Sequence, residues 1–230
     1  MISIRDHASL DRSGTDGLEV VHHVGATFGG PGGSPVRGLL GWDEIEMAPG
    51  SGFEPHDAAE AEIFFFVRRG AILHRDSLGN NREVRAGDVQ TLGAGASVLH
   101  EQLNVGYQPA RFVRILVSPR RPGLMPRWAR KPFPADKRDS RWTVLASGFD
   151  DPGALTIIAD ARILAANLAA GEKLRYLLEP GRTAYLVASE GAVRIDGVPL
   201  LAGDGAVLDA QSEFELKADE LAEIILVEIG

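Results

Sequence analysis

Residues 64–92, FFFVRRGAILHRDSLGNNREVRAGDVQTL, decide the fold of this chain. They read as an apolar strand, a glycine turn at Gly70, an alternating strand, a polar turn, a short strand, and then Gly87 and Asp88 before a further strand. Glycine adopts the positive φ that tight hairpins need. The stretch therefore predicts a series of short strands joined by tight turns.

The same order of strands and turns recurs in residues 184–208, AYLVASEGAVRIDGVPLLAGDGAVL. Gly191 takes the place of the first glycine turn, and Gly203 with Asp204 takes the place of the Gly-Asp pair. An internal repeat of this kind indicates two copies of one β unit. The 27 glycines and 13 prolines are spread along the chain, as expected for an all-β protein with many turns.

The repeat divides the 230 residues into two antiparallel β-barrel domains, predicted at residues 1–120 and 143–230. A proline-rich and basic stretch, residues 121–142, lies between them. Proline removes a backbone donor and disfavours helix, so this stretch is expected to be an extended crossover. Residues 153–176 are rich in alanine, but they lie where the second unit needs its early strands, and we expect mostly strand there.

Composition excludes several classes of function. The chain has no cysteine, which excludes disulfides, thiolate metal sites and cysteine nucleophiles. Its net charge of −8 argues against a nucleic-acid partner. No stretch reaches the ~18 consecutive apolar residues that span a bilayer, and the N-terminal residues carry charges where a signal peptide would be apolar. We therefore expect a cytoplasmic protein with no membrane partner.

A candidate binding site begins in residues 52–70, GFEPHDAAEAEIFFFVRRG. His56 is followed two residues later by Ala58, and alternate residues of a strand lie on one face. A histidine in both positions would form a metal chelate, so the alanine raises the question of whether a metal binds here. Further along the chain, His100 and Gln102 have the same spacing.

These residues resemble the two sequence motifs of cupins, which are small β-barrels, and most closely those of the pirin branch. The resemblance is carried by HRDSLGN at 74–80 and GDVQ at 87–90, together with His56, Gly70 and His100. It covers nearly the whole chain and implies a bicupin, with two jelly-roll barrels in one chain. Pirins bind one metal, usually iron, in the N-terminal barrel. Some relatives cleave the flavonol quercetin with dioxygen, and others act as nuclear cofactors.

The resemblance implies four metal-ligand positions, which in this sequence hold His56, Ala58, His100 and Gln102. Alanine cannot bind a metal and glutamine offers only a neutral amide oxygen, so two of the four family ligands are missing. We therefore expect Fe(II) or another divalent metal at low occupancy, or none. Glu62 could replace a missing ligand. It lies an even number of residues from His56, so strand alternation would place it on the same face, and it corresponds to a ligand of other cupins. His56, His100 and Glu62 would then form a two-histidine, one-carboxylate set.

The same strand alternation predicts which other side chains face the pocket. Ala58, Phe64 and Phe66 are expected to line the pocket around a small aromatic ligand. His74 is interpreted as a structural residue of a hairpin. No histidine follows His100, so the C-terminal barrel is expected to be structural.

The sequence leaves two functions open. The first is a pirin-like bicupin with an eroded N-terminal metal site, which binds a small molecule or has a regulatory role with a protein partner that the sequence does not identify. The alternative is an iron-dependent dioxygenase of the quercetinase type that uses His56, His100 and Glu62. In that enzyme Glu62 would be the catalytic proton acceptor where it is not a ligand. Fold alone does not separate the two, because the barrel supports both.

Overall fold

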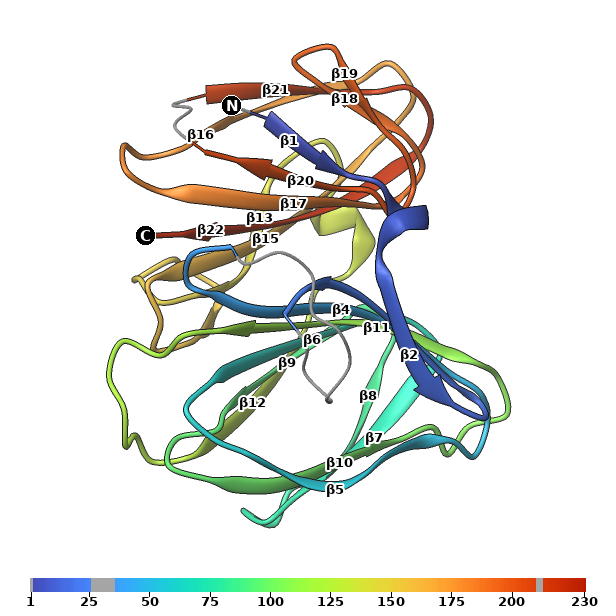
Figure 1. Ribbon diagram of the computed structural model, residues 1–230, viewed down its shortest axis with the longest axis vertical. Coiled ribbons are helices and arrows are strands. Elements are labelled where there is room, and N and C mark those ends of the chain that lie inside the picture. The colour runs from blue at the N-terminus through green and yellow to red at the C-terminus, as the bar shows by residue number, and fades with distance from the viewer. Residues whose placement is uncertain (1, 26–35, 210–212) are drawn as a thin grey trace. The chain divides into compact units, whose positions relative to one another are not determined.

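The computed structural model describes residues 2–25, 36–209 and 213–230 (Figure 1). Strands dominate it, and the helical elements among these residues are two 3₁₀ turns, η1 at His7–Ser9 and η2 at Ala135–Lys137. The chain divides into two compact units, each with a larger and a smaller sheet. The predicted all-β class with two jelly-roll domains is therefore confirmed, with sheets that stay open instead of closing into complete barrels.

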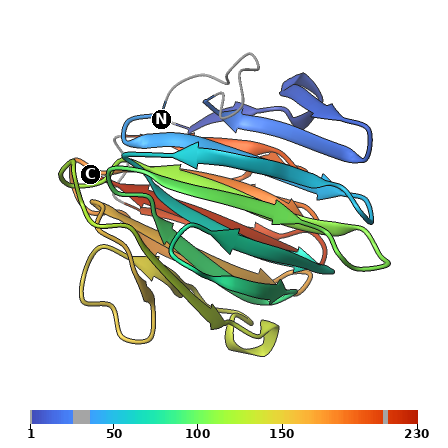
Figure 2. The same ribbon diagram turned by 90° about the horizontal axis from the view of Figure 1, so that it is seen from below.

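The N-terminal unit comprises residues 11–133 and the short segment 155–160, which contains β14 (Leu155–Thr156). Its larger sheet has the strand order β12-β9-β6-β11-β4-β3-β2, and Figure 2 shows neighbouring strands of this sheet side by side. These strands are β2 (Asp11–Thr15), β3 (Leu18–Val24), β4 (Leu39–Met47), β6 (Glu62–Arg69), β9 (Asp88–Gly93), β11 (Ala110–Val117) and β12 (Arg127–Pro132). The smaller sheet, in the order β5-β10-β7-β8, contains β5 (Gly52–Ala58), β7 (Ala71–Asp76), β8 (Asn81–Arg85) and β10 (Val98–Leu103).

The C-terminal unit comprises residues 1–10, 134–154 and 161–230. Within this unit the strands of the larger sheet follow the order β1-β20-β17-β22-β15-β13, and the smaller sheet has the order β16-β21-β18-β19. The larger sheet contains β1 (Ile2–Arg5), β13 (Thr143–Ser147), β15 (Ala161–Leu168), β17 (Thr183–Glu190), β20 (Gly205–Leu208) and β22 (Ala222–Ile229). The smaller contains β16 (Lys173–Leu177), β18 (Val193–Ile195), β19 (Val198–Leu200) and β21 (Glu213–Ala218).

This division differs from the predicted boundaries at residues 120 and 142 in two places. β1, near the start of the chain, pairs with β20 of the C-terminal unit, with Ile2 opposite Leu208. β12 lies inside the predicted crossover but pairs with β9, so residues 127–132 extend the N-terminal sheet. β12 is the edge strand of that sheet, where a proline such as Pro132 is tolerated.

The apolar core of the N-terminal unit draws on both of its sheets. On β6, the alternate residues Ile63, Phe65 and Val67 belong to this core. They pack in one cluster with Ile72 of β7 and Leu92 of β9. Because successive residues of a strand point to opposite faces, the odd-numbered positions of β6 face the interior of this unit.

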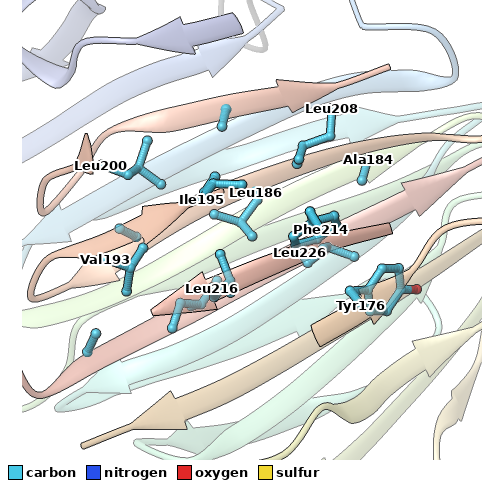
Figure 3. Close-up of a cluster of buried hydrophobic side chains, with 14 of the residues drawn as sticks. Tyr176, Ala184, Leu186, Val193, Ile195, Leu200, Leu208, Phe214, Leu216 and Leu226 are labelled. Carbon is cyan, nitrogen blue, oxygen red and sulfur yellow. The ribbon is translucent and has the colours of Figure 1, made fainter. Parts of the chain in front are cut away.

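The C-terminal unit has a comparable core. Leu186 of β17, Phe214 of β21 and Leu226 of β22 lie in one buried cluster that combines the two sheets (Figure 3). The alanine-rich stretch 153–176, which we expected to be mostly strand, supplies β15 and the first part of β16. Apolar burial against the core therefore outweighs the helix propensity of alanine in this stretch.

The sequence repeat corresponds to a repeat of turns. Gly70 follows β6 and Gly191 follows β17, and both have a φ of 70°. The aspartates of the two Gly-Asp pairs, Asp88 and Asp204, also act alike. Each accepts a hydrogen bond on Oδ2 from the backbone N–H three residues before it, at 2.9 Å. The prediction of two copies of one β unit is confirmed by these matching turns.

Among the described residues, no helix is long and apolar enough to cross a membrane. The cytoplasmic location stays a prediction.

We expect Gly191→Ala to destabilise the C-terminal unit. A Cβ atom at Gly191 would come 2.1 Å from the carbonyl oxygen of Leu221, and the φ lies in the left-handed region. Strain at such a φ costs about 1–3 kcal/mol, and the overlap with a backbone atom adds to that cost. Urea unfolding followed by circular dichroism measures the loss of unfolding free energy.

The matched control is Gly181→Ala, because Gly181 has a φ of 82° but nothing within 4 Å of an added Cβ. It should lose less stability than Gly191→Ala. Equal losses would show that the contact with Leu221 carries no cost.

Candidate functional site

Two histidines from neighbouring strands meet inside the N-terminal unit. β5 and β10 pair so that His56 lies opposite His100, and the centroids of the two imidazole rings are 4.3 Å apart. Both side chains line a cavity of about 200 Å³. Its walls are formed by His56, Asp57, Ala58, Ala59, Ala61, Ile63, His100, Arg114 and Leu116. The structure thus brings His56, Ala58 and His100 to one cavity.

A buried chain of hydrogen bonds begins at Asp76 on β7, the strand on the other side of β10. His74 Nε2 lies 3.0 Å from Asp76 Oδ2. Burial favours a raised pKa for Asp76, but hydrogen bonds from His74 and Asn80 lower the pKa overall, so the carboxylate is ionised and can only accept. Burial lowers the pKa of His74, so its ring is neutral at pH 7. The single ring hydrogen of His74 must then lie on Nε2, where Asp76 accepts it.

The tautomer of His74 determines the orientation of the Gln102 amide. With its hydrogen on Nε2, His74 has an acceptor at Nδ1, so Gln102 must present its amide nitrogen there, at 3.3 Å. Gln90 Nε2 lies 3.0 Å from the same atom. The Gln102 nitrogen also lies 2.7 Å from Nδ1 of His100. That Nδ1 is therefore an acceptor as well, and the hydrogen of His100 is on Nε2.

Both cavity histidines are neutral at pH 7. Burial is the main cause that lowers the pKa of His100 to about 3, and the neighbouring His56, His74 and Arg114 act in the same direction. Burial also lowers the pKa of His56. Nδ1 of His56 donates to the backbone oxygen of Glu54 at 2.8 Å, so the lone pair of this ring is on Nε2. The two rings therefore hold their hydrogens on different nitrogens.

Arg114 brings a positive charge to the wall of the cavity. It lies opposite Asp43 in the pairing of β11 with β4, and Asp43 Oδ2 accepts from its Nε at 3.1 Å and its Nη2 at 2.7 Å. Asp43 Oδ1 lies 2.6 Å from His22 Nδ1, and His22 Nε2 lies 2.7 Å from Ser13 Oγ. The order Ser-His-Asp matches a nucleophilic triad, but this carboxylate already compensates the charge of Arg114. We interpret the chain as a support that holds the guanidinium in place.

Glu62 lies away from the cavity, and its neighbour Ile63 lines the wall instead. The Glu62 carboxylate accepts a hydrogen bond from Arg127 of β12. The expectation that Glu62 shares a face with His56 does not hold. Glu60 between them has a φ of 51°, and the two strands belong to different sheets. Side-chain alternation continues only within one strand. The structure therefore does not assemble the two-histidine, one-glutamate set.

Phe64 and Phe66 share the face of Glu62 and are likewise absent from the cavity wall described above. The aromatic side chain of β6 near the histidines is Phe65, whose ring centroid is 6.5 Å from that of His100. The same turn that displaces Glu62 displaces these two phenylalanines. Ala58, the third residue expected in the pocket, does line it.

Sequence reasoning missed His74, Asp76 and Arg114. The interpretation of His74 as a hairpin residue overlooked its position opposite Gln102. The signal was present in HRDSLGN, where His74 and Asp76 are two residues apart and so share a face of the strand. For Arg114, the signal was a basic residue in the middle of the apolar strand 110–117.

The cavity residues do not fit a resident divalent metal. Among the described residues, no group of three or more histidine, aspartate or glutamate side chains is arranged to hold a metal ion. His100 carries its hydrogen on Nε2, and Gln102 turns its amide nitrogen, not its oxygen, toward that ring. The guanidinium of Arg114, whose charge Asp43 balances, also lines the cavity where a metal would need a carboxylate ligand.

The two jelly-roll units, with a histidine-lined cavity in the first, define the class of two-domain cupins. A family model described as "Pirin" matches residues 33–117, and one described as "Quercetinase C-terminal cupin domain" matches residues 144–229. A pirin-like protein of Caulobacter vibrioides is 40% identical over 213 residues, which cover 92% of this chain and 92% of that protein. The chain belongs to the pirin family.

The chain is also similar to more distant proteins. The crystal structure of YhhW from Escherichia coli has a TM-score of 0.93 and 23% identity, and the match covers 100% of this chain and 98% of that one. A protein of Escherichia coli named quercetin 2,3-dioxygenase is 27% identical over 188 residues, or 81% of this chain and 79% of that protein.

The neutral histidines make stability depend on pH. A histidine whose pKa is lower in the folded state stabilises the fold above its unfolded pKa of about 6.5, and this contribution is lost as the pH falls toward the folded pKa. For His100, whose pKa is about 3, the free energy of unfolding should fall by about 2 kcal/mol between pH 7 and pH 5. Urea unfolding at the two pH values measures this. His100→Gln should show a smaller loss, and a loss as large as that of the wild type would contradict the expectation.

Proposed function

We propose that this pirin-family chain is a small-molecule-binding protein whose N-terminal cavity works without a resident metal. The observation that carries the proposal is the 2.7 Å contact between Gln102 Nε2 and His100 Nδ1. It leaves the hydrogen of His100 on Nε2, the atom that a metal in the cavity would need as a ligand. A regulatory role, in which ligand binding changes contact with a protein partner, is compatible with this function.

Restoring a metal here would require several changes at once. Loss of an outer hydrogen-bond partner alone typically costs about 10–100-fold in metal affinity, and Ala58 removes a ligand outright. Gln102 supplies no negative charge, and Arg114, which is paired with Asp43, supplies none either. The Gln102 amide would also have to turn over, which would bring its oxygen against the acceptor Nδ1 of His74.

A metal-dependent dioxygenase of the quercetinase type is the second candidate. Two neutral imidazoles with ring centroids 4.3 Å apart favour it, because neutral imidazole is the form that binds metals. Its relatives favour it too, since one is named quercetin 2,3-dioxygenase and YhhW has been solved in complex with nickel(II). In this candidate His56 and His100 would hold Fe(II) or another divalent metal. Glu62, which is bound to Arg127, would not act as the third ligand or as the proton acceptor.

Metal content separates the two candidates. Wild-type protein purified from iron-supplemented cells should hold well under one metal per chain by elemental analysis, and should cleave quercetin weakly or not at all. The double variant Ala58→His with Gln102→Glu rebuilds the family ligand set and should gain metal. Metal should then raise its melting temperature, because a ligand that binds only the folded state stabilises it.

Glu62→Gln is the control, because it alters a carboxylate of the same unit that lies away from the cavity. It should leave the metal content unchanged. Stoichiometric metal in the wild type that disappears in His56→Ala would overturn the proposal and support the dioxygenase. Metal that disappears in Glu62→Gln would show that the two-histidine, one-glutamate set forms in solution.

A further inference from the structure

We infer that the N-terminal cavity selects a small organic carboxylate, and that Asp76, which does not line the cavity, is the positioning residue that sets this preference. The inference rests on the proposed function, because it requires a cavity without a resident metal. It extends that function by naming the class of ligand and the residue that controls its recognition.

The volume of the cavity limits the size of the ligand. The cavity has about 200 Å³, whereas pockets for drug-sized ligands have about 300–1,000 Å³. A molecule with a single ring, or a smaller one, fits this limit better than a three-ring flavonol. The rings of Phe65 and Phe53 lie near His100 and His56, with centroid distances of 6.5 and 6.2 Å. Benzoate is therefore a suitable probe.

The wall of the cavity suits a negative oxygen. Arg114 is protonated, since a guanidinium stays protonated in proteins, and Asp43 accepts from its Nε and Nη2. The Nδ1 edge of His100 is turned toward Gln102, so the edge that faces the cavity carries the Nε2 hydrogen. Hydrogen bonds to a charged group are roughly twice as strong as neutral ones. A carboxylate can accept from Nε2 of His100 beside the Arg114 guanidinium, whereas an uncharged amide of the same shape gains much less.

Among the described residues that line the cavity, Asp57 has the one carboxylate. Its side chain is exposed and accepts a hydrogen bond from Ser97 Oγ at 3.3 Å. Solvent therefore screens its charge.

Asp76 determines the hydrogen on His100 through its two oxygens. Oδ1 accepts from the backbone N–H groups of Leu78 and Asn80, both at 3.0 Å, and Oδ2 accepts from His74 Nε2 and from the side-chain amide of Asn80 at 2.8 Å. In Asp76→Asn, these two backbone donors would keep the amide oxygen at the Oδ1 position. The amide nitrogen would then face Nε2 of His74 and the side-chain amide of Asn80, which would turn its oxygen to accept from it. His74 would have to carry its hydrogen on Nδ1.

The change would pass through Gln102 to the cavity. Gln102 would turn its amide oxygen to accept from Nδ1 of His74, and the same oxygen would accept from Nδ1 of His100. The hydrogen of His100 would move to Nδ1, and its cavity edge would carry a lone pair. Asp76→Asn should therefore weaken carboxylate binding. Electrostatics alone predicts tighter carboxylate binding, because the substitution removes a negative charge.

Nitrogen NMR of the histidine rings tests the orienting chain directly. In wild-type protein at pH 7, His100 should show a protonated Nε2 and a bare Nδ1, with its signals identified by their loss in His100→Gln. In Asp76→Asn the two nitrogens should exchange roles. A protonated Nδ1 on His100 in the wild type would overturn the inference, whatever the variant does.

Calorimetry with benzoate and benzamide tests the ligand class. The wild type should bind benzoate about tenfold more tightly than its neutral isostere benzamide. Asp76→Asn should lose most of that preference, while Asp16→Asn, the same substitution at an exposed aspartate of the same unit that does not line the cavity, should keep it. Equal affinities in the wild type would overturn the carboxylate class. An equal loss in both variants would overturn the role of Asp76.

These outcomes are separate from a failure of the proposed function, which metal content decides. A metal-poor protein that does not distinguish benzoate from benzamide would overturn this inference alone. Circular dichroism and thermal melting establish whether Asp76→Asn is folded. Where it is not, the ring-nitrogen signals and the benzoate preference of the wild type decide the inference by themselves.

Discussion

The hydrogen bond between the Asp76 carboxylate and His74 is the interaction on which the candidate site depends. The same carboxylate closes the turn between β7 and β8, because it accepts from the backbone of Leu78 and from both the backbone and side chain of Asn80. Its side chain is fully buried, so water cannot replace these partners. Asp76 therefore shapes the local backbone and also determines which ring nitrogen carries the hydrogen in His74 and in His100.

This arrangement has an energetic cost. The Oε1 atoms of Gln90 and Gln102 are buried and have no hydrogen-bond partner among the described residues. A buried acceptor without a partner costs about 1–3 kcal/mol. Both amides are held in this orientation because their nitrogens donate to His74. Polar groups that lower stability within an otherwise apolar interior are typical of functional sites.

The two units share a scaffold but differ in their polar interiors. In the C-terminal unit, the Tyr176 hydroxyl donates to Glu228, which also pairs with Arg182 and with Arg162. Burial raises the pKa of Tyr176, and the bond to Glu228 adds to this effect. Opposite charges there compensate one another within the network. In the N-terminal unit Asp43 likewise compensates Arg114, but Arg114 also lines the cavity of the candidate binding site.

Local chemistry along the chain was enough to predict the fold class, the paired turns at Gly70 and Gly191, and the grouping of His56 with Ala58 and of His100 with Gln102. These features depend on the φ of glycine and on side-chain alternation, which act within a few residues. The face of Glu62 could not be obtained in this way, because the positive φ of Glu60 interrupts the alternation. The partners across strands also required the tertiary structure. Only the register between distant segments places His74 opposite Gln102 and Arg114 opposite Asp43, and those contacts decide which hydrogens and charges the cavity presents.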